Sequence, residues 1–177
     1  MKIIIARHGS AEDKSASDQD ADRNLVKEGR EQAQLIGEVL AATLEKVDAI
    51  WTSPFARAKQ TAEIAGKPLK LKPVLEENLA IGGDIEQLCW KMQREAMSTI
   101  MLVGHQPDLG RLAARLLGFV SEVSLKKGGL CVVETRDPSK PVGRAVATLE
   151  PRQYPEILAG REYVPWVRTR QIVPPEN

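Results

Sequence analysis

Residues 2–9 read KIIIARHG, a short apolar run that ends on an arginine, a histidine and a glycine. The isoleucine-rich segment Lys2–Ala6 predicts a strand buried on both faces, as in a parallel sheet. His8 follows this strand and is one of only 2 histidines in the chain. The other, His105, closes the apolar segment TIMLVGH (99–105), which predicts a second buried strand. Each histidine is therefore expected where a strand ends.

Around these two strands, apolar runs alternate with segments of helical periodicity. The helix over 53–66 is expected to have Ser53 as its N-cap, Pro54 at its first position and Gly66 as its end. The alternation predicts an α/β fold, a three-layer α/β/α sandwich with a mostly parallel central sheet and an antiparallel edge. Further strands are expected over 48–53, 69–75, 129–135 and 143–150, and further helices over 26–47, 83–96 and 106–118.

Composition narrows the class of protein. A length of 177 residues fits a single domain over 1–177, in which the proline-containing residues 161–177 are expected to be an irregular tail. The net charge of +1 gives no support for a nucleic-acid or membrane-surface partner. Cys89 and Cys131 form no CxxC motif and are predicted to be buried free thiols. With no signal-peptide pattern and no run of about 20 apolar residues, we expect a cytoplasmic protein.

The carboxyl ends of parallel strands are where α/β sheets bind ligands, so the two histidines are candidate site residues. Two histidines without a further ligand make a poor zinc site, and the cation of Arg7 beside His8 would repel a metal ion. An arginine suits an oxyanion, since its planar fork binds phosphate oxygens. Arg57 is a second candidate, because it lies in the first turn of a helix that follows another strand.

Together, these two arginines and two histidines can perform phosphoryl transfer without a metal or a cofactor. The arginines would neutralise charge on the phosphoryl oxygens. One neutral imidazole would attack phosphorus to form a phosphohistidine intermediate, which water then hydrolyses. Gly9 would remove a side chain that crowds the phosphate and would let the backbone turn sharply. The sequence thus favours a phosphatase that uses a covalent intermediate.

Four stretches resemble, in the same order, the motifs of the histidine phosphatase superfamily, the phosphoglycerate mutase-like group. They are ARHGSA (6–11), LVKEGREQA (25–33), SPFARAKQTAEI (53–64) and VGHQP (103–107). The resemblance implies that His8 is the nucleophile and that Arg7, Arg57 and His105 hold the phosphate. It also implies the phosphoglycerate mutase-like form of the three-layer fold.

Within this group the chain is most similar to the short SixA-type phosphohistidine phosphatases. The similarity lies in its compact length, in the RHGxA form and in a DxxRxL segment made by Asp20, Arg23 and Leu25. It implies that Arg23 is a further phosphate ligand, while an exposed loop arginine among aspartates stays the alternative. The segment departs from the pattern at Asn24 and Val26, where proline and threonine are usual.

The general acid is the least defined part of the resemblance. Mutase-like members use a carboxylate after the third strand, which falls here in PVLEENLAIGGD (73–84). The alignment places Asn78 at the acidic position, so the neighbouring Glu77 is the candidate acid and Glu76 is a more distant one. An imidazole, with a pKa of about 6.5, leaves more readily than an alkoxide does. A missing acid therefore fits a phosphohistidine substrate better than a sugar phosphate.

The predicted function is that of a metal-independent phosphatase acting on phosphohistidine in a partner protein, with no cofactor and with no nucleic-acid or membrane partner. A phosphomonoesterase for a small metabolite is the alternative within the same superfamily. A non-catalytic module that binds a phosphorylated partner is an alternative of another class, although it would not need the nucleophile His8. A flavodoxin-like nucleotide binder would need a glycine-rich loop after the first strand, which the chain lacks.

Overall fold

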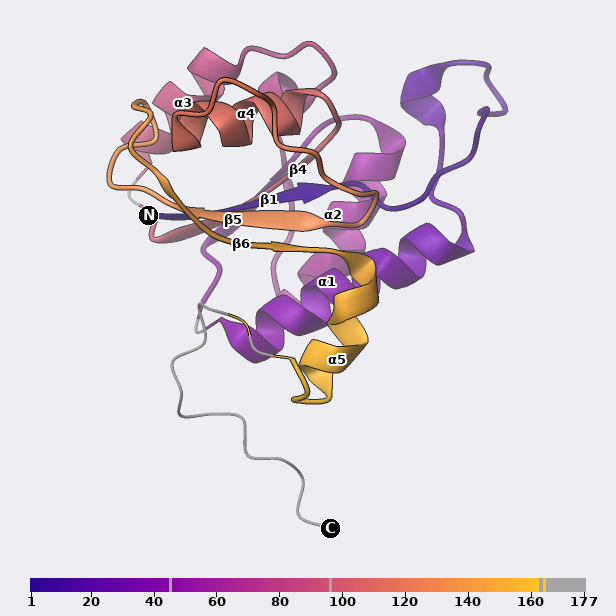
Figure 1. Cartoon of the computed structure of the whole chain (residues 1–177). Helices are drawn as coiled ribbons and strands as arrows, with labels where there is room; N and C mark the ends of the chain where they lie inside the picture. The colour runs from indigo at the N-terminus through magenta and orange to yellow at the C-terminus, as the bar shows by residue number, and fades with distance from the viewer. Residues whose placement is uncertain (45, 96, 163, 165–177) are drawn as a thin grey trace.

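The computed structural model describes residues 1–44, 46–95, 97–162 and 164, and it contains one mixed β-sheet (Figure 1). The strand order is β3-β2-β4-β1-β5-β6. The first four of these strands pair in parallel, whereas β5 and β6 are antiparallel additions at one edge, which confirms the predicted α/β architecture. Their bounds are β1 Lys2–Arg7, β2 Ala49–Thr52, β3 Val74–Leu75, β4 Thr99–Gly104, β5 Leu130–Glu134 and β6 Arg144–Leu149.

Helices cover both faces of this sheet (Figure 1). Strand β1 alternates between them: Ile4 and Ala6 belong to the core beneath α1, α2 and α5, while Ile3 and Ile5 belong to the core beneath α3 and α4. All four side chains are fully buried, as the continuous apolar run of β1 predicts. The helices are α1 Lys27–Thr43, α2 Ala56–Leu69, α3 Ile85–Arg94, α4 Asp108–Leu117 and α5 Tyr154–Leu158, and the 3₁₀ turns are η1 Asp20–Asp22, η2 Glu77–Leu79 and η3 Pro151–Gln153.

The predicted ends of the second helix were wrong at both termini. Helix α2 begins at Ala56 with Phe55 as its N-cap, because Ser53 lies in the preceding turn, where its Oγ accepts a hydrogen bond from the Phe55 amide at 3.3 Å. Nor does the helix end at Gly66. The chain turns back after Leu69, and a Cβ on Gly66 would lie 2.4 Å from the carbonyl oxygen of Leu71. Glycine therefore serves close packing at this position.

Some other predicted strands and helices differ in length from those in the structure. The strand expected over 69–75 has only two residues, and the helix expected over 26–47 ends at Thr43. Helix α5 was not predicted; it packs beside α1, and its buried Tyr154 donates a hydrogen bond to the carbonyl of Gly128 at 2.7 Å. The tail expected over 161–177 lies almost entirely outside the described residues.

The cysteine prediction is confirmed, because Cys89 and Cys131 are both free and buried. In the part of the chain that the structure describes, no helix combines the length and apolar character needed to cross a bilayer.

Candidate active site

The sheet order brings the two histidines together, as the sequence predicts. Strands β1 and β4 are parallel neighbours, and Arg7 pairs in register with Gly104, so His8 and His105 leave the sheet side by side. The amide of His8 donates a hydrogen bond to the carbonyl of Gly104 at 3.1 Å. The centroids of the two imidazole rings are 5.1 Å apart.

His8 presents an unprotonated nitrogen to the site. Its Nδ1 lies 2.7 Å from the carbonyl oxygen of Gly9, which can only accept, so Nδ1 carries the proton. The other nitrogen, Nε2, accepts a hydrogen bond from Nε of Arg57 at 3.3 Å. Burial, followed by the nearby cations of Arg57, Arg7 and Lys127, lowers the pKa of His8 to about 4, against the opposing effect of the Gly9 hydrogen bond. At neutral pH the imidazole of His8 is therefore uncharged, as the predicted role of His8 as nucleophile requires.

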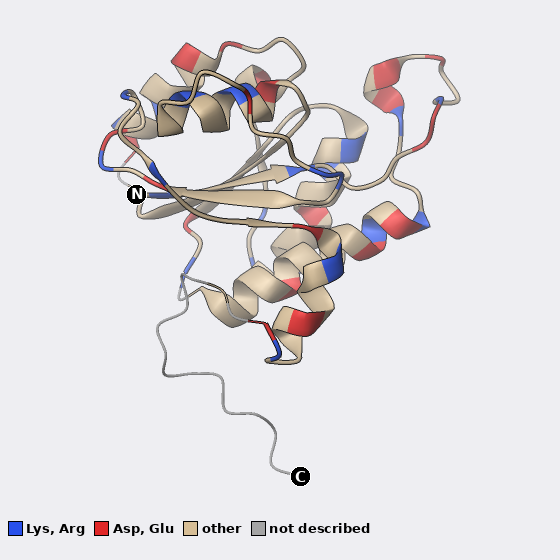
Figure 2. Ribbon diagram, viewed as in Figure 1, with Lys and Arg blue, Asp and Glu red and all other residues tan. Residues whose placement is uncertain are grey.

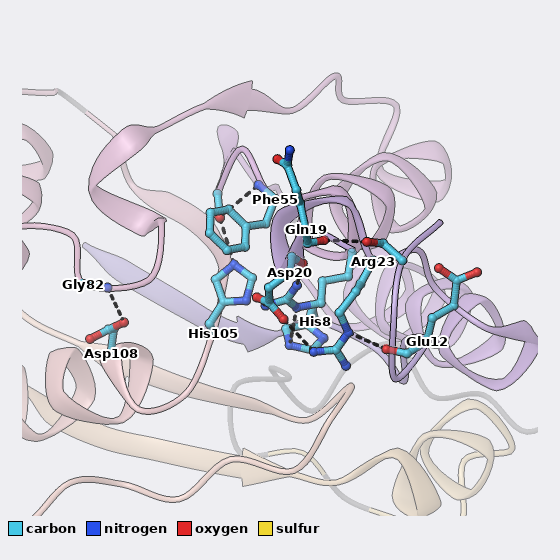
Figure 3. A network of polar contacts seen from close by, with 12 residues as sticks. His8, Glu12, Gln19, Asp20, Arg23, Phe55, Gly82, His105 and Asp108 are labelled. Atoms are coloured by element: carbon cyan, nitrogen blue, oxygen red, sulfur yellow. Dashed lines mark hydrogen bonds and ion pairs between the residues drawn. The ribbon is translucent and has the colours of Figure 1, made fainter. Parts of the chain in front are cut away.

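His105 is held by Ser53. Its Nε2 lies 2.9 Å from the hydroxyl oxygen of Ser53, which accepts the amide of Phe55 and is free to donate its own proton to the imidazole. When Ser53 is the donor, the proton of His105 lies on Nδ1, a buried nitrogen without a partner that points toward Asp20 and His8 (Figure 3). Burial, followed by electrostatic repulsion from His8 and Arg57, lowers the pKa of His105 to about 3, against the opposing effect of the Asp20 carboxylate. In this tautomer, His105 offers one neutral N–H donor to the site.

The two predicted arginines border the same space. Arg7 donates from Nη1 to the carbonyl of Leu125 at 2.9 Å, while its buried Nε has no partner. Arg57 is almost completely buried and donates to Asp20 twice, from Nη1 to the backbone oxygen at 2.6 Å and from Nη2 to the carboxylate at 2.9 Å. Because buried N–H groups are normally satisfied, the unpaired Nε of Arg7 and Nδ1 of His105 make this space a candidate anion-binding site.

Asp20 is a site residue that the sequence analysis did not identify, although it quoted Asp20 within the DxxRxL segment. It lies in η1, on a segment where acidic residues are frequent (Figure 2). Its carboxylate accepts from Arg57 through one oxygen and from Nη1 of Arg23 through the other, at 2.8 Å. Arg23 also donates from Nε to the carbonyl of Glu12 (Figure 3). The structure therefore joins Arg23 to the site through Asp20.

Gly9 has a packing role that the sequence analysis missed. Its amide donates to the hydroxyl of Thr61 at 3.1 Å, and a Cβ at this position would lie 2.4 Å from the carbonyl oxygen of Gly29 in α1. Reciprocally, a Cβ on Gly29 would lie 1.9 Å from the carbonyl of Ser10. This pair of glycines lets α1 approach the loop after β1. Contact between Gly9 and a phosphate stays a prediction.

The candidate acids differ in environment. Glu76 is buried and forms an ion pair with Lys91, and the amide of Asn78 donates to it at 3.1 Å. Burial alone would raise the pKa of Glu76, but the hydrogen bonds from Lys91 and Asn78 outweigh burial and hold the pKa below its ordinary value. Glu77 is exposed, and none of the described side-chain interactions connects it to the histidines. Its role as an acid stays a prediction.

Within the described residues, no three histidine, cysteine, aspartate or glutamate side chains are grouped to hold a metal ion.

The family model of the histidine phosphatase superfamily, branch 1, matches residues 3–99, which include the RHG motif and Arg57. The chain belongs to the histidine phosphatase superfamily. It is accordingly a phosphatase, and its fold is the phosphoglycerate mutase-like one.

Relatives of this histidine phosphatase include SixA proteins. Phosphohistidine phosphatase SixA of Escherichia coli K12 is 31% identical over 121 residues, covering 66% of this chain and 74% of the relative. A SixA homolog of Haemophilus influenzae is 28% identical over 138 residues, covering 70% and 82% of the two chains. A solved structure of the protein histidine phosphatase SixA in complex with tungstate superposes with a TM-score of 0.78 at 26% identity, covering 86% of this chain and 99% of that one.

Proposed function

We propose that this histidine phosphatase removes the phosphoryl group from phosphohistidine in a partner protein, through a covalent intermediate on His8. The observation that carries the proposal is the unprotonated Nε2 of His8, which faces Nε of Arg57 at 3.3 Å and lies in a site with unpaired buried donors. A neutral nucleophile surrounded by donors is the arrangement that phosphoryl transfer needs.

The reaction proceeds in two displacements at phosphorus. Nε2 of His8 forms a bond to phosphorus, while the bond between phosphorus and the substrate nitrogen breaks and leaves its electron pair on the substrate imidazole. Arg7, Arg57 and the Nδ1–H of His105 bind the phosphoryl oxygens and offset their charge. A water molecule then attacks phosphorus, the bond to His8 breaks, and neutral His8 and inorganic phosphate result.

The environment of the acidic segment supports an imidazole leaving group. Glu76 is held as a carboxylate by Lys91, Asn78 has no proton to give at neutral pH, and the candidate acid Glu77 is exposed, with no described side-chain contact to the histidines. An alkoxide leaving group would need a strong acid here, whereas a phosphorylated imidazole with a protonated second nitrogen leaves as a neutral ring. The names of the SixA relatives are consistent with this substrate class.

A comparison of substrates tests the proposal. The purified protein and its His8→Ala variant would be given a phosphohistidine-bearing protein, an aryl phosphate and an alkyl phosphate, each with and without EDTA. We expect the wild type to act on the phosphohistidine protein far faster than on the alkyl phosphate, with EDTA having no effect, and His8→Ala to be inactive. Efficient hydrolysis of alkyl phosphates with phosphohistidine untouched would indicate a small-metabolite phosphatase instead. Binding of the phosphoprotein without turnover would indicate a binding module.

A further inference from the structure

The carboxylate of Asp20 bridges two guanidinium groups in the site. One oxygen accepts from Nη2 of Arg57 at 2.9 Å, and the other accepts from Nη1 of Arg23 at 2.8 Å. Figure 3 shows Asp20 beside His8 and His105, on the side toward which the unpaired Nδ1 of His105 points. An anion that belongs to the chain itself thus occupies arginine donors that an incoming phosphoryl group needs.

The two partners of this ion pair differ in their exposure. The side chain of Arg57 is only 4% exposed, whereas that of Asp20 is 52% exposed. A buried guanidinium needs an anion nearby at all times, because a buried unpaired charge is costly. A half-exposed carboxylate can return to water at small cost. The ion pair is therefore one that Asp20 can leave, provided that another anion takes its place on Arg57.

We propose that Asp20 is an exchangeable counter-anion, which neutralises Arg57 and Arg23 in the empty site and gives up these guanidinium groups to the phosphoryl group of the substrate. Asp20 then sets the affinity of the site for oxyanions. By competing with and repelling the phosphate that remains after hydrolysis, its carboxylate favours release of the product. The inference rests on the proposed function only for the identity of the anion as a phosphoryl group.

The exchange needs only a rotation of the Asp20 side chain. Nη1 of Arg57 stays bound to the backbone oxygen of Asp20 at 2.6 Å, so η1 keeps its place on α2. The segment is also tied internally, since the hydroxyl of Ser15 donates to the carbonyl of Gln19 at 2.7 Å. The backbone around Asp20 can thus remain in position while the carboxylate moves out to solvent.

The neighbouring Asp22 offers a matched control. It lies in the same 3₁₀ turn, is exposed, and accepts from the hydroxyl of Ser17 at 2.6 Å, while none of the described ion pairs joins it to an arginine. Asp20→Asn and Asp22→Asn remove the same charge from nearly the same place. A general effect of charge on anion binding would appear in both variants, whereas loss of the exchange would appear only in Asp20→Asn.

The experiment measures binding of inorganic phosphate to the full chain by calorimetry and by inhibition of aryl phosphate hydrolysis. We expect Asp20→Asn to bind phosphate roughly three- to tenfold more tightly than the wild type, because the competing charge is gone. Asp22→Asn should stay within about twofold of the wild type. Phosphate should also raise the melting temperature of Asp20→Asn more than that of the wild type, which shows that the variant is folded.

Unchanged or weaker phosphate binding by Asp20→Asn overturns the proposal; weaker binding would make Asp20 a residue that positions Arg57. An equal gain in Asp22→Asn also overturns it, as does the absence of phosphate binding in all three proteins. These outcomes are distinct from a failure of the proposed function. A protein that rejects phosphohistidine substrates but gains phosphate affinity on Asp20→Asn would retain the exchange and lose only the assigned substrate.

Discussion

Nε of Arg57 lies 3.3 Å from Nε2 of His8 and donates to it, so the guanidinium group faces the lone pair of the proposed nucleophile. The proton on Nδ1 of His8 is fixed by the carbonyl of Gly9 at 2.7 Å. These two contacts make Nε2 the unprotonated ring nitrogen of His8, which is the nitrogen that the proposed mechanism uses. They also place a cation where the charge of a bound phosphoryl group would develop.

Arg57→Lys should lower kcat/KM for an aryl phosphate by about 100-fold, which is typical for the loss of one charge-stabilising donor. A lysine has a single ammonium group, which cannot face His8 and at the same time hold the backbone oxygen and one carboxylate oxygen of Asp20. Lys59→Gln, at an exposed position of the same helix, serves as the control and should retain wild-type activity. Steady-state kinetics of the two variants test this prediction. If Arg57→Lys kept more than half of the wild-type activity, Arg57 would not be the residue that stabilises the phosphoryl charge.

Nitrogen-15 NMR can measure which ring nitrogen carries the proton in His8 and in His105. Nitrogen-15 NMR of the free protein at neutral pH should show both histidines neutral, with the proton on Nδ1 in each ring, because of the contacts with Gly9 and Ser53. In Ser53→Ala the preference of His105 should weaken and that of His8 should persist. A proton on Nε2 of His8 would be incompatible with its role as the nucleophile.

Stability should fall on the acid side of neutrality. The pKa of His8 is lowered from 6.5 to about 4 and that of His105 to about 3, so the unfolded chain binds protons that the folded chain does not. The free energy of unfolding therefore decreases as the pH falls below about 6.5, by roughly 1.4 kcal/mol per unit of pKa difference for each group. Above about pH 6.5 both imidazoles are neutral in the folded and in the unfolded chain, so neither histidine makes the free energy of unfolding depend on pH.

Urea unfolding at pH 7.5 and pH 5 measures this effect. The folded variant His105→Gln should lose less stability between the two pH values than the wild type, since one of the two buried imidazoles is gone. An identical loss in both proteins would mean that other groups control the acid sensitivity.

Much of the site can be predicted from the sequence, because the carboxyl ends of parallel strands lie at the same edge of the sheet. The apolar runs before His8 and His105 predicted buried strands, and the pairing of β1 with β4 brings these histidines together. The arginine at position 57 was predicted from its place after a strand, and it does lie in the first turn of α2. These features depend on local pattern and on the general geometry of α/β sheets.

The remaining features depend on contacts between segments that are distant in sequence. Ser53 was expected to cap a helix, but it contacts His105, and that contact requires the positions of β2 and β4 to be known. Asp20 lies in a polar loop without periodicity, and only the DxxRxL segment gave a signal for it. The need for Gly29 arises from the approach of α1 to the loop after β1, which no local pattern reveals.

The close contact between α1 and the loop after β1 leads to a prediction about stability. Gly29→Ala should lower the free energy of unfolding by more than about 2 kcal/mol, because its Cβ would lie 1.9 Å from the carbonyl of Ser10 and backbone must move. In an exposed helix the same change would be stabilising by about 1 kcal/mol. Glu31→Ala, at an exposed position of α1, should change stability by less than about 0.5 kcal/mol. Urea unfolding measures both variants; a neutral or stabilising Gly29→Ala would show that the approach is looser than described.

The covalent intermediate on His8 is the central claim, and trapping it is the most direct test. The wild type would be mixed with a phosphohistidine-bearing protein labelled in its phosphoryl group, quenched with base within milliseconds, digested and mapped by mass spectrometry. The predicted result is a phosphoryl group on Nε2 of His8, stable in base and labile in acid, and absent from His8→Ala. Turnover with no phosphoryl group on His8 at any time, or with the label on another residue, would contradict the mechanism.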